Sequence, residues 1–218
     1  DGSKLFSCAT DKSVRMWDSE AGWSATPLLA HGTEVVRIAL SPDDRFLVSA
    51  DITGQVMAWD LNGSLAEPKQ HFAPPEGAIW ALVFSNDGKY LLSGSADRNA
   101  RLWTMTDKGL PETANVLRGH EDTINSAAFS PDGHWVATAS RDGTVRLWDL
   151  TSKQPQESPR TFDMLESNGI ERVYFDADSK RVFAGAGNGS IHVWYPEPLG
   201  NRTDHQILLG HAKKVSAI

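Results

Sequence analysis

One stretch of the chain decides its fold: SPDGHWVATASRDGTVRLWD, residues 130–149. Two runs within it, 135–140 and 144–148, read as short strands, and each follows a turn signal. Pro and Gly in the Ser-Pro-Asp-Gly at 130–133 favour a tight turn, and the Arg-Asp-Gly between the runs supplies a glycine for a positive φ. Together with the apolar run 124–129, the stretch predicts three antiparallel strands joined by turns.

The tryptophan at the end of this stretch recurs along the chain. Five tryptophans stand 42 to 46 residues apart, at Trp17, Trp59, Trp103, Trp148 and Trp194. An aspartate stands sixteen residues before each of them, at Asp1, Asp43, Asp87, Asp132 and Asp178. The segment from aspartate to tryptophan never changes length, whereas the connection to the next copy does. The chain is therefore predicted to be a repeat array with a rigid scaffold and variable loops, with outer strands near 114–118 and 206–209.

Composition excludes several classes of protein. Of the 218 residues, 40% are hydrophobic and 22% charged, which is typical of a globular chain with a sizeable core. No stretch approaches the roughly 18 apolar residues of a membrane-spanning helix. The net charge of −7 disfavours broad attraction to nucleic acid or anionic lipid. The single cysteine, Cys8, excludes an internal disulfide and fits a reducing compartment, so a cytoplasmic location is expected.

The fourth repeat carries motifs of a known family. Gly119-His120 is followed by Ser-Pro-Asp-Gly and then by DGTVRLWD, residues 142–149. At this spacing the chain resembles a WD-repeat β-propeller over essentially its whole length. The resemblance implies an all-β fold of four-stranded antiparallel blades around a channel, with five repeats here and incomplete first and last blades.

Both ends of the chain enter a repeat part-way. Asp1 lies at the turn after a first strand, and residues 205–218 open a further repeat. One interpretation is a closed five-bladed ring in which the C-terminal residues complete the first blade. The other, which we favour because seven blades are the commonest family form, is a slice of a longer propeller. In both, residues 1–218 form a single propeller region.

The resemblance also implies a buried polar network across each blade. Its positions carry over to the fourth repeat as His120, Ser140, Asp142 and Trp148. An indole N–H only donates, a hydroxyl donates and accepts, imidazole relays a hydrogen bond, and a carboxylate accepts. These four residues are therefore expected to form one hydrogen-bonded chain with a structural role.

The other repeats depart from this pattern. The second keeps His31 and Trp59 but has Asp51 at the serine position and Thr53 at the aspartate position. In the fifth, the three partner positions of the tryptophan are Asn188, Ala186 and Glu166, so its network is predicted to be largely absent.

Apparent catalytic and metal-binding signatures have structural explanations. The glycine-rich run 185–189 resembles a phosphate-binding loop, but a strand at 191–194 follows it where a nucleotide site needs a helix N-terminus. His31, His120 and His211 occupy the same position in different repeats, so they are interpreted as structural and not as metal ligands. We expect no enzymatic activity, no cofactor and no metal.

Two positions in each repeat project from a loop face that binds partners in members of the family. The candidate contact residues are Trp80, Asn125, Arg141 and Glu171, and Trp and Arg are the commonest hot-spot residues of interfaces. The alternative for Trp80 is packing between blades, and for Arg141 it is a solvated charge in a turn. The tight turns of Ser-Pro-Asp-Gly type, at the other end of each blade, are not expected to bind.

The predicted function is a non-catalytic scaffold that presents this loop face to protein or peptide partners, with no role for nucleic acid or membrane. One alternative is a sensory or regulatory C-terminal propeller of a larger multidomain NTPase or kinase, which residues upstream of Asp1 would decide. A third is a propeller enzyme or metal-binding propeller, which would need clustered acids, histidines or a bound metal in the channel.

Overall fold

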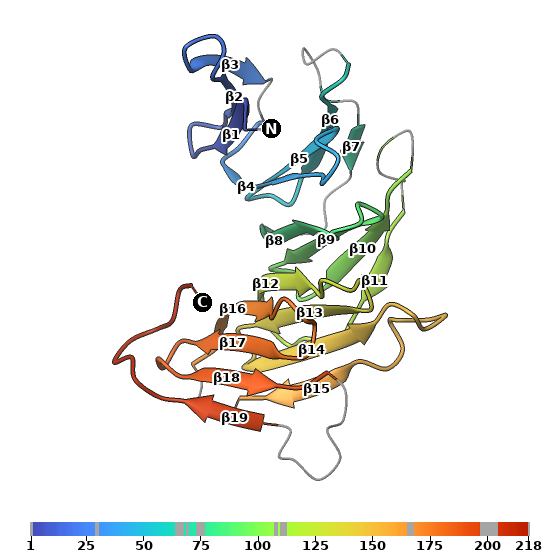
Figure 1. Cartoon of the computed structure of the whole chain (residues 1–218), viewed down its shortest axis with the longest axis vertical. Helices are drawn as coiled ribbons and strands as arrows, with labels where there is room; N and C mark the ends of the chain where they lie inside the picture. Colours follow the sequence, from blue (N-terminus) through green and yellow to red (C-terminus); the bar gives the residue numbers. More distant parts are fainter. Residues whose placement is uncertain are drawn as a thin grey trace.

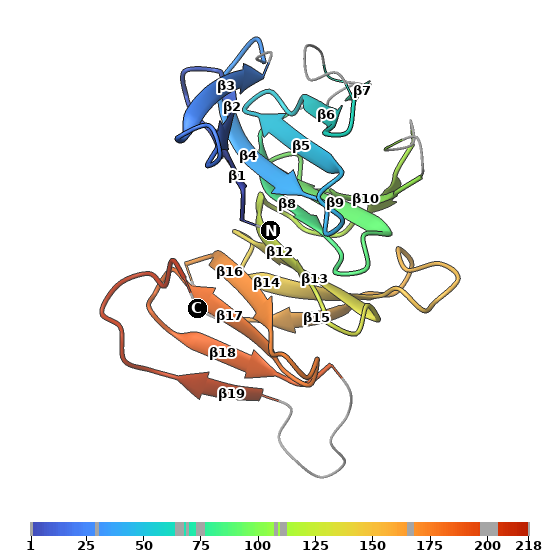
Figure 2. The ribbon, with the colours of Figure 1, turned by 45° about the horizontal axis from the view of Figure 1, so that its top comes forward.

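In the computed structural model the chain folds into five antiparallel sheets that follow one another along an arc (Figures 1 and 2). The structure describes residues 2–28, 31–63, 68, 70–72, 77–106, 109, 113–164, 168–196 and 205–217. Every regular element in these residues is a strand. The prediction of an all-β chain of antiparallel blades is confirmed.

Each sheet pairs its strands in chain order. The first sheet contains β1 (Lys4–Cys8), β2 (Val14–Asp18) and β3 (Ser24–Leu28). The second contains β4 (Val35–Leu40), β5 (Phe46–Asp51), β6 (Val56–Asp60) and β7 (Gln70–Phe72). The third contains β8 (Ile79–Phe84), β9 (Tyr90–Ser95), β10 (Ala100–Thr104) and β11 (Asn115–Leu117).

The fourth sheet contains β12 (Ile124–Phe129), β13 (Trp135–Ser140), β14 (Thr144–Asp149) and β15 (Arg160–Asp163). The fifth contains β16 (Ile170–Phe175), β17 (Val182–Ala186), β18 (Ile191–Trp194) and β19 (His205–Leu208). Strands β4, β8, β12 and β16 contact one another in succession and are the inner strands of their sheets. The first sheet has three strands, as expected. Contrary to the expectation of an incomplete last blade, the fifth sheet has four, because β19 pairs with β18 along its length.

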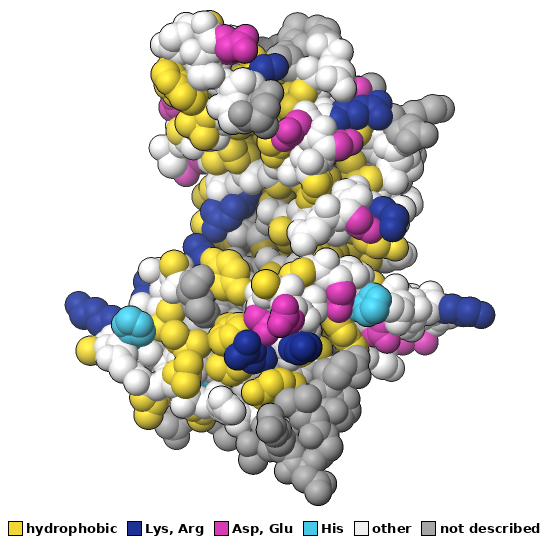
Figure 3. Space-filling view, in the orientation of Figure 1, with side chains coloured by type: hydrophobic (Ala, Val, Ile, Leu, Met, Phe, Trp, Pro, Cys, Tyr) yellow, Lys and Arg dark blue, Asp and Glu magenta, His cyan; other side chains and the backbone are white. Residues whose placement is uncertain are grey.

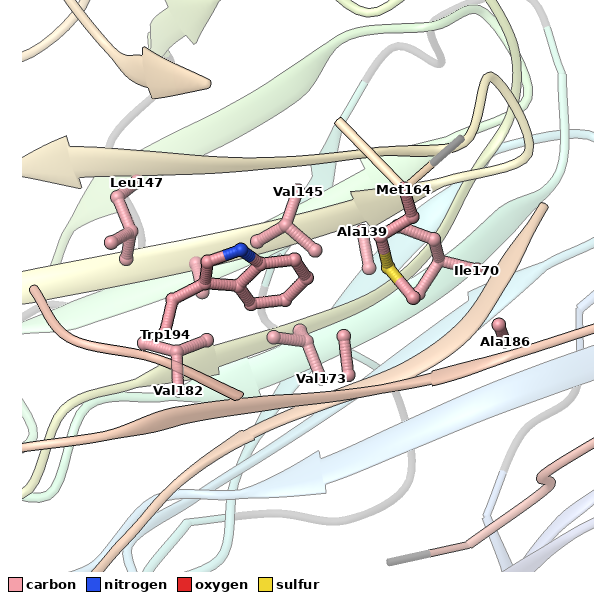
Figure 4. Close-up of a cluster of buried hydrophobic side chains, with 11 residues drawn as sticks. Ala139, Val145, Leu147, Met164, Ile170, Val173, Val182, Ala186 and Trp194 are labelled. Atoms are coloured by element: carbon pink, nitrogen blue, oxygen red, sulfur yellow. The ribbon is translucent and has the colours of Figure 1, made fainter. Parts of the chain in front are cut away.

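The hydrophobic core lies between neighbouring sheets. Four clusters of buried side chains each join two successive sheets. Each cluster contains one of the repeating tryptophans, in chain order Trp59, Trp103, Trp148 and Trp194. In the last cluster, Trp194 reaches from the fifth sheet toward Val145 and Leu147 of the fourth (Figure 4). The repeat period is thus the spacing at which the chain places one large indole between two sheets.

The aspartate sixteen residues before the tryptophan closes a tight turn. The Ser130 hydroxyl donates to Asp132 Oδ1 at 2.6 Å and accepts from the N–H of Trp135 at 2.9 Å. Asp132 Oδ1 also accepts from the N–H of His134 at 3.0 Å, and Gly133 takes the expected positive φ of 75°. In the fifth repeat Asp176, and not Asp178, accepts from the turn N–H groups.

Close approach of the sheets requires small residues at fixed places. A Cβ on Gly94 would lie 2.6 Å from Ile124 Cγ2 and 3.1 Å from the Cβ of Ala81. Gly185 has the same relation to Val215, whose N–H donates to the Ala186 carbonyl at 3.1 Å.

Replacing Gly94 by alanine should therefore lower the free energy of unfolding by about 1–3 kcal/mol, because the added methyl group overpacks the interface with Ile124. Denaturant titration measures the change. Gly32→Ala is the matched control, since no atom lies within 4 Å of the added Cβ. Equal midpoints for the two variants would contradict close packing at Gly94.

Candidate protein-binding face

In the fourth sheet, a chain of hydrogen bonds runs from the interface tryptophan to the loop end of the blade. Trp148 Nε1 donates to Thr138 Oγ1 at 3.0 Å, and Thr138 Oγ1 lies 2.8 Å from His120 Nε2. His120 Nδ1 lies 2.8 Å from Asp142 Oδ2. If the indole N–H, the Thr138 hydroxyl and the His120 Nδ1–H each donate toward Asp142, every side-chain polar group in this series of hydrogen bonds has a partner. All four side chains are buried or nearly so.

The prediction for Ser140 was wrong in one respect. Thr138 is the hydroxyl that joins His120 to Trp148, whereas Ser140 donates to the Asp122 carbonyl at 3.0 Å and accepts from the N–H of Asp142 at 3.1 Å. The strand register explains this, because Trp148 pairs with Val136. Thr138 is the next residue on the same face of β13, and Ser140 lies about 6.6 Å further along.

Asp142 organises the turn that follows β13. Besides His120, it accepts from the N–H of Glu121 at 2.9 Å and from the N–H and hydroxyl of Thr144 at 2.8 and 2.7 Å. Burial raises the pKa of Asp142, but the hydrogen bonds from His120, Glu121 and Thr144 outweigh it and hold that pKa far below its usual range. The carboxylate is therefore the anchor of this end of the blade.

The second sheet keeps the histidine, hydroxyl and acid with the acid displaced, but the buried Trp59 Nε1 has no hydrogen-bond partner among the described residues. His31 Nδ1 lies 3.1 Å from Asp51 Oδ2, and His31 Nε2 lies 2.5 Å from Ser49 Oγ. Asp51 also accepts from the hydroxyls of Thr33 and Thr53. Asp51 thus takes the role of Asp142 from a position two residues earlier.

In the fifth sheet, two histidines replace the acid. His192 Nε2 lies 2.9 Å from the Ser190 hydroxyl, which donates to Asn188 Oδ1 at 2.7 Å. His192 Nδ1 lies 2.8 Å from His205 Nε2 of β19, and both rings lie beside Trp194. The prediction that the acid, serine and histidine of the fourth sheet are missing here is correct, but a different polar chain fills the space. Burial, and then the charge of His205, lower the pKa of His192 to about 4.

The inner strands share a β-bulge at their second residue. The pairing register shifts between Val35 and Arg37 in β4, and at the corresponding point of β8, β12 and β16. The residues at the four bulges are Val36, Trp80, Asn125 and Glu171. A bulge re-aims its side chain away from the regular ladder. Three of the four candidate contact residues therefore occupy one structural position.

A groove of about 280 Å³ crosses the inner strands. The residues that line it are Arg37, Trp80, Ala81, Leu82, Val83, Asn125, Ser126, Ala127, Arg172 and Tyr174. Figure 3 shows Lys and Arg side chains on this side of the arc, beside the inner strands. The groove therefore combines aromatic, aliphatic and basic side chains from four successive strands.

The candidate contact residues divide between this groove and its surroundings. Trp80 is half-buried, and the Arg37 guanidinium lies 5.6 Å from its ring centroid. Asn125 is only 9% exposed, and its Nδ2 donates to the Ile170 carbonyl of the next sheet at 2.9 Å. Asn125 thus joins two sheets at the groove floor.

Arg141 and Glu171 are not among the lining residues. Arg141 is exposed on the turn held by Asp142, and its N–H donates to the Thr123 carbonyl at 2.9 Å. The Glu171 carboxylate lies 3.7 Å from Lys214 Nζ, on the segment after β19. Arg37, Arg172 and Tyr174 were not identified as groove residues from the sequence. Arg37 and Arg172 directly follow the bulge residues Val36 and Glu171, and this shared position could have indicated them.

Comparison with known proteins agrees with the repeats. A family model described as "WD domain, G-beta repeat" matches residues 1–18, 24–60, 66–104 and 111–149, which together make up more than half of the chain. The chain belongs to the WD-repeat family. Each matched segment ends at the residue that directly follows one of the repeating tryptophans.

Curated WD-repeat relatives match parts of the chain. "Target of rapamycin complex subunit wat1" of Schizosaccharomyces pombe is 30% identical over 101 residues, covering 46% of this chain and 32% of the relative. "Nuclear distribution protein PAC1" of Arthroderma otae and of Trichophyton verrucosum are each 28% identical over 146 residues, covering 57% of this chain and 31% of each relative. The matched region is about a third of the length of these proteins.

Two absences hold for the part of the WD-repeat chain that the structure describes. No group of three or more His, Cys, Asp or Glu side chains is arranged to hold a metal ion. No helix within the same residues has the length and apolar character needed to cross a bilayer.

Replacing His120 by alanine should lower the free energy of unfolding by about 1–3 kcal/mol, because Thr138 and Asp142 each lose a buried partner. Thr138→Val should have a similar effect through His120 and Trp148. Chemical denaturation measures both variants. His134→Ala is the control, since the His134 side chain is exposed in a turn; a His120 variant as stable as this control would contradict the network.

Stability should fall as the pH falls from about 7.5 to about 5, in part because of His192. Its pKa is lowered in the folded chain, so the unfolded state binds the proton first and the stabilising effect is lost below the ordinary pKa of about 6.5. His192 should contribute about 1–2 kcal/mol to this loss. Chemical denaturation of the wild type and of His192→Gln between about pH 7.5 and 5 isolates the contribution of His192. If the free energy of unfolding depends on pH in the same way for both proteins, His192 does not titrate as expected.

Proposed function

We propose that this chain is a non-catalytic scaffold that binds protein or peptide partners at the groove over β4, β8, β12 and β16. The observation that carries the proposal is the half-buried indole of Trp80 at a bulge in the groove. A bulge residue is outside the regular ladder, and a tryptophan there offers a large contact area with an N–H donor. Aromatic and arginine side chains beside each other are typical of the centre of protein interfaces.

In this proposal the binding surface continues from the groove onto the loop face. Arg141 projects from a turn beside the first residues of β12, and Glu171 occupies the bulge of β16. Both lie at the same end of the blades as Trp80 and Asn125. The name of one relative, a subunit of the target of rapamycin complex, supports a role in protein assembly.

A cytoplasmic location is part of the same proposal. It rests on the single cysteine. Cys8 is half-buried and free, and burial raises the pKa of its thiol, which keeps the reduced thiol protonated and unreactive.

Selection of displayed random peptides on the immobilised chain tests the function. The selected peptides should bind Trp80→Ala at least about tenfold more weakly than the wild type, because the indole supplies much of the contact area. Adding Arg141→Ala should weaken binding further if the partner reaches the turn. The measurement is fluorescence polarisation with a labelled selected peptide.

Trp23→Ala is the matched control, since Trp23 is 53% exposed before the outer strand β3. His134→Ala tests the opposite turns and should also leave affinity unchanged. If no peptide is enriched, or if Trp80→Ala binds as tightly as Trp23→Ala with the fold intact by circular dichroism, the proposed function is wrong.

A further inference from the structure

Two arginines in the groove have no acidic partner among the residues that the structure describes. Arg37 Nε donates to the Trp80 carbonyl at 2.7 Å, and its Nη1 donates to the Val36 carbonyl at 2.6 Å. Arg172 Nη1 donates to the Glu171 carbonyl at 2.8 Å. Neither guanidinium forms an ion pair with a described carboxylate. Other arginines do pair with an aspartate of their own sheet, as Arg15, Arg101 and Arg181 show.

The charges of the groove differ from those of the chain as a whole. The chain has a net charge of −7, yet the residues that line the groove include two arginines and no Asp or Glu. Arg37 and Arg172 line the same groove, and burial, followed by the charge of Arg172, lowers the pKa of Arg37. Two like charges in a partly buried site are stabilised by an anion that contacts both. The groove therefore favours a ligand that carries a negative charge.

The remaining donors suit a carboxylate. The hydrogen bonds above use Nε and Nη1 of Arg37 and only Nη1 of Arg172. Each guanidinium keeps N–H groups without a partner among the described residues, and a guanidinium presents paired N–H groups to a carboxylate.

Apolar surface lies beside these donors. Trp80 is half-buried, Tyr174 is 39% exposed, and Leu82 and Val83 also line the groove. A ligand that fills the groove should therefore carry a negative group next to an apolar one. An acidic residue beside an aromatic or aliphatic residue in a polypeptide meets both demands.

We infer that the groove binds an acidic segment of a protein partner, with an Asp or Glu side chain between Arg37 and Arg172 and an adjacent apolar side chain on Trp80 and Tyr174. This inference rests on the proposed function and names its ligand. A nucleic acid fits less well, because it carries charge at every phosphate and the net negative chain repels a long polyanion. A few carboxylates can be neutralised within the groove itself.

Arg172→Glu is the decisive variant. The Arg172 guanidinium donates to the Glu171 carbonyl of its own strand, and its loss leaves the hydrogen bond from Arg37 to the Trp80 carbonyl in place. Peptides selected on the wild type should be enriched in Asp and Glu beside apolar residues. Their affinity should fall at least about tenfold on Arg172→Glu, and it should fall when salt is raised from about 50 to about 500 mM. Arg172→Lys should bind more tightly than Arg172→Glu but more weakly than the wild type, because it keeps the charge and loses the paired N–H groups.

Arg118→Glu is the matched charge reversal, since Arg118 is exposed next to the outer strand β11. It should bind the peptides as the wild type does. Circular dichroism and the denaturation midpoint show that each variant is folded.

The outcomes separate this inference from the proposed function. Peptides that need Trp80 but show no acidic enrichment and bind Arg172→Glu at full affinity would overturn the acidic ligand and leave the scaffold in place. Failure to select any peptide, or indifference to Trp80→Ala, would overturn both. A labelled single-stranded oligonucleotide that binds the wild type more tightly than the peptides, and loses affinity on Arg172→Glu, would overturn the peptide in favour of nucleic acid.

Discussion

Burial of one tryptophan between each pair of neighbouring sheets is the interaction on which the rest of the structure depends. A four-stranded sheet cannot bury both of its faces alone, so each sheet is stabilised by the indole that it places against the preceding one. The indole N–H then needs an acceptor, and Thr138 supplies it in the fourth sheet. From there the hydrogen bonds pass through His120 to Asp142, which holds the turn that carries Arg141. The apolar interface and the loop face are thus connected within one blade.

The other repeats place different residues where the fourth sheet has Asp142 and its hydrogen-bond partners. Asp51 replaces the acid from an earlier position, and in the third sheet Asp97 binds Arg101 at 2.7 Å. The fifth sheet uses a pair of neutral rings, His192 and His205. Several side-chain sets thus provide partners for most buried polar atoms near the indoles, and the buried Trp59 Nε1 is an exception among the described residues. Divergent repeats can therefore pack at the same interface.

The sequence predicted the parts of the structure that depend on local patterns. Tryptophan spacing and turn residues were enough for the all-β fold and for strands such as β12 to β14. The error at Ser140 arose because spacing along the chain does not specify which residue of a strand faces the indole; the pairing of Trp148 with Val136 does. The groove was missed because Arg37 and Arg172 come from different sheets, and only the arrangement of the inner strands brings them together.

In each inner strand, a buried residue that stabilises the interface between sheets is followed directly by a bulge residue whose type differs from blade to blade. The residue before each bulge is β-branched and at most 3% exposed, at Val35, Ile79, Ile124 and Ile170. The next residue is the bulge itself, and it varies freely in size and charge. Because a bulge residue leaves the regular ladder, its side chain is not fixed by strand pairing, although Asn125 uses that freedom to bond the Ile170 carbonyl of the next sheet. Each blade can therefore present a different chemical group at this end of its inner strand while keeping the same buried neighbour, and two of these groups, Trp80 and Asn125, line the groove. A repetitive scaffold thus acquires an asymmetric surface.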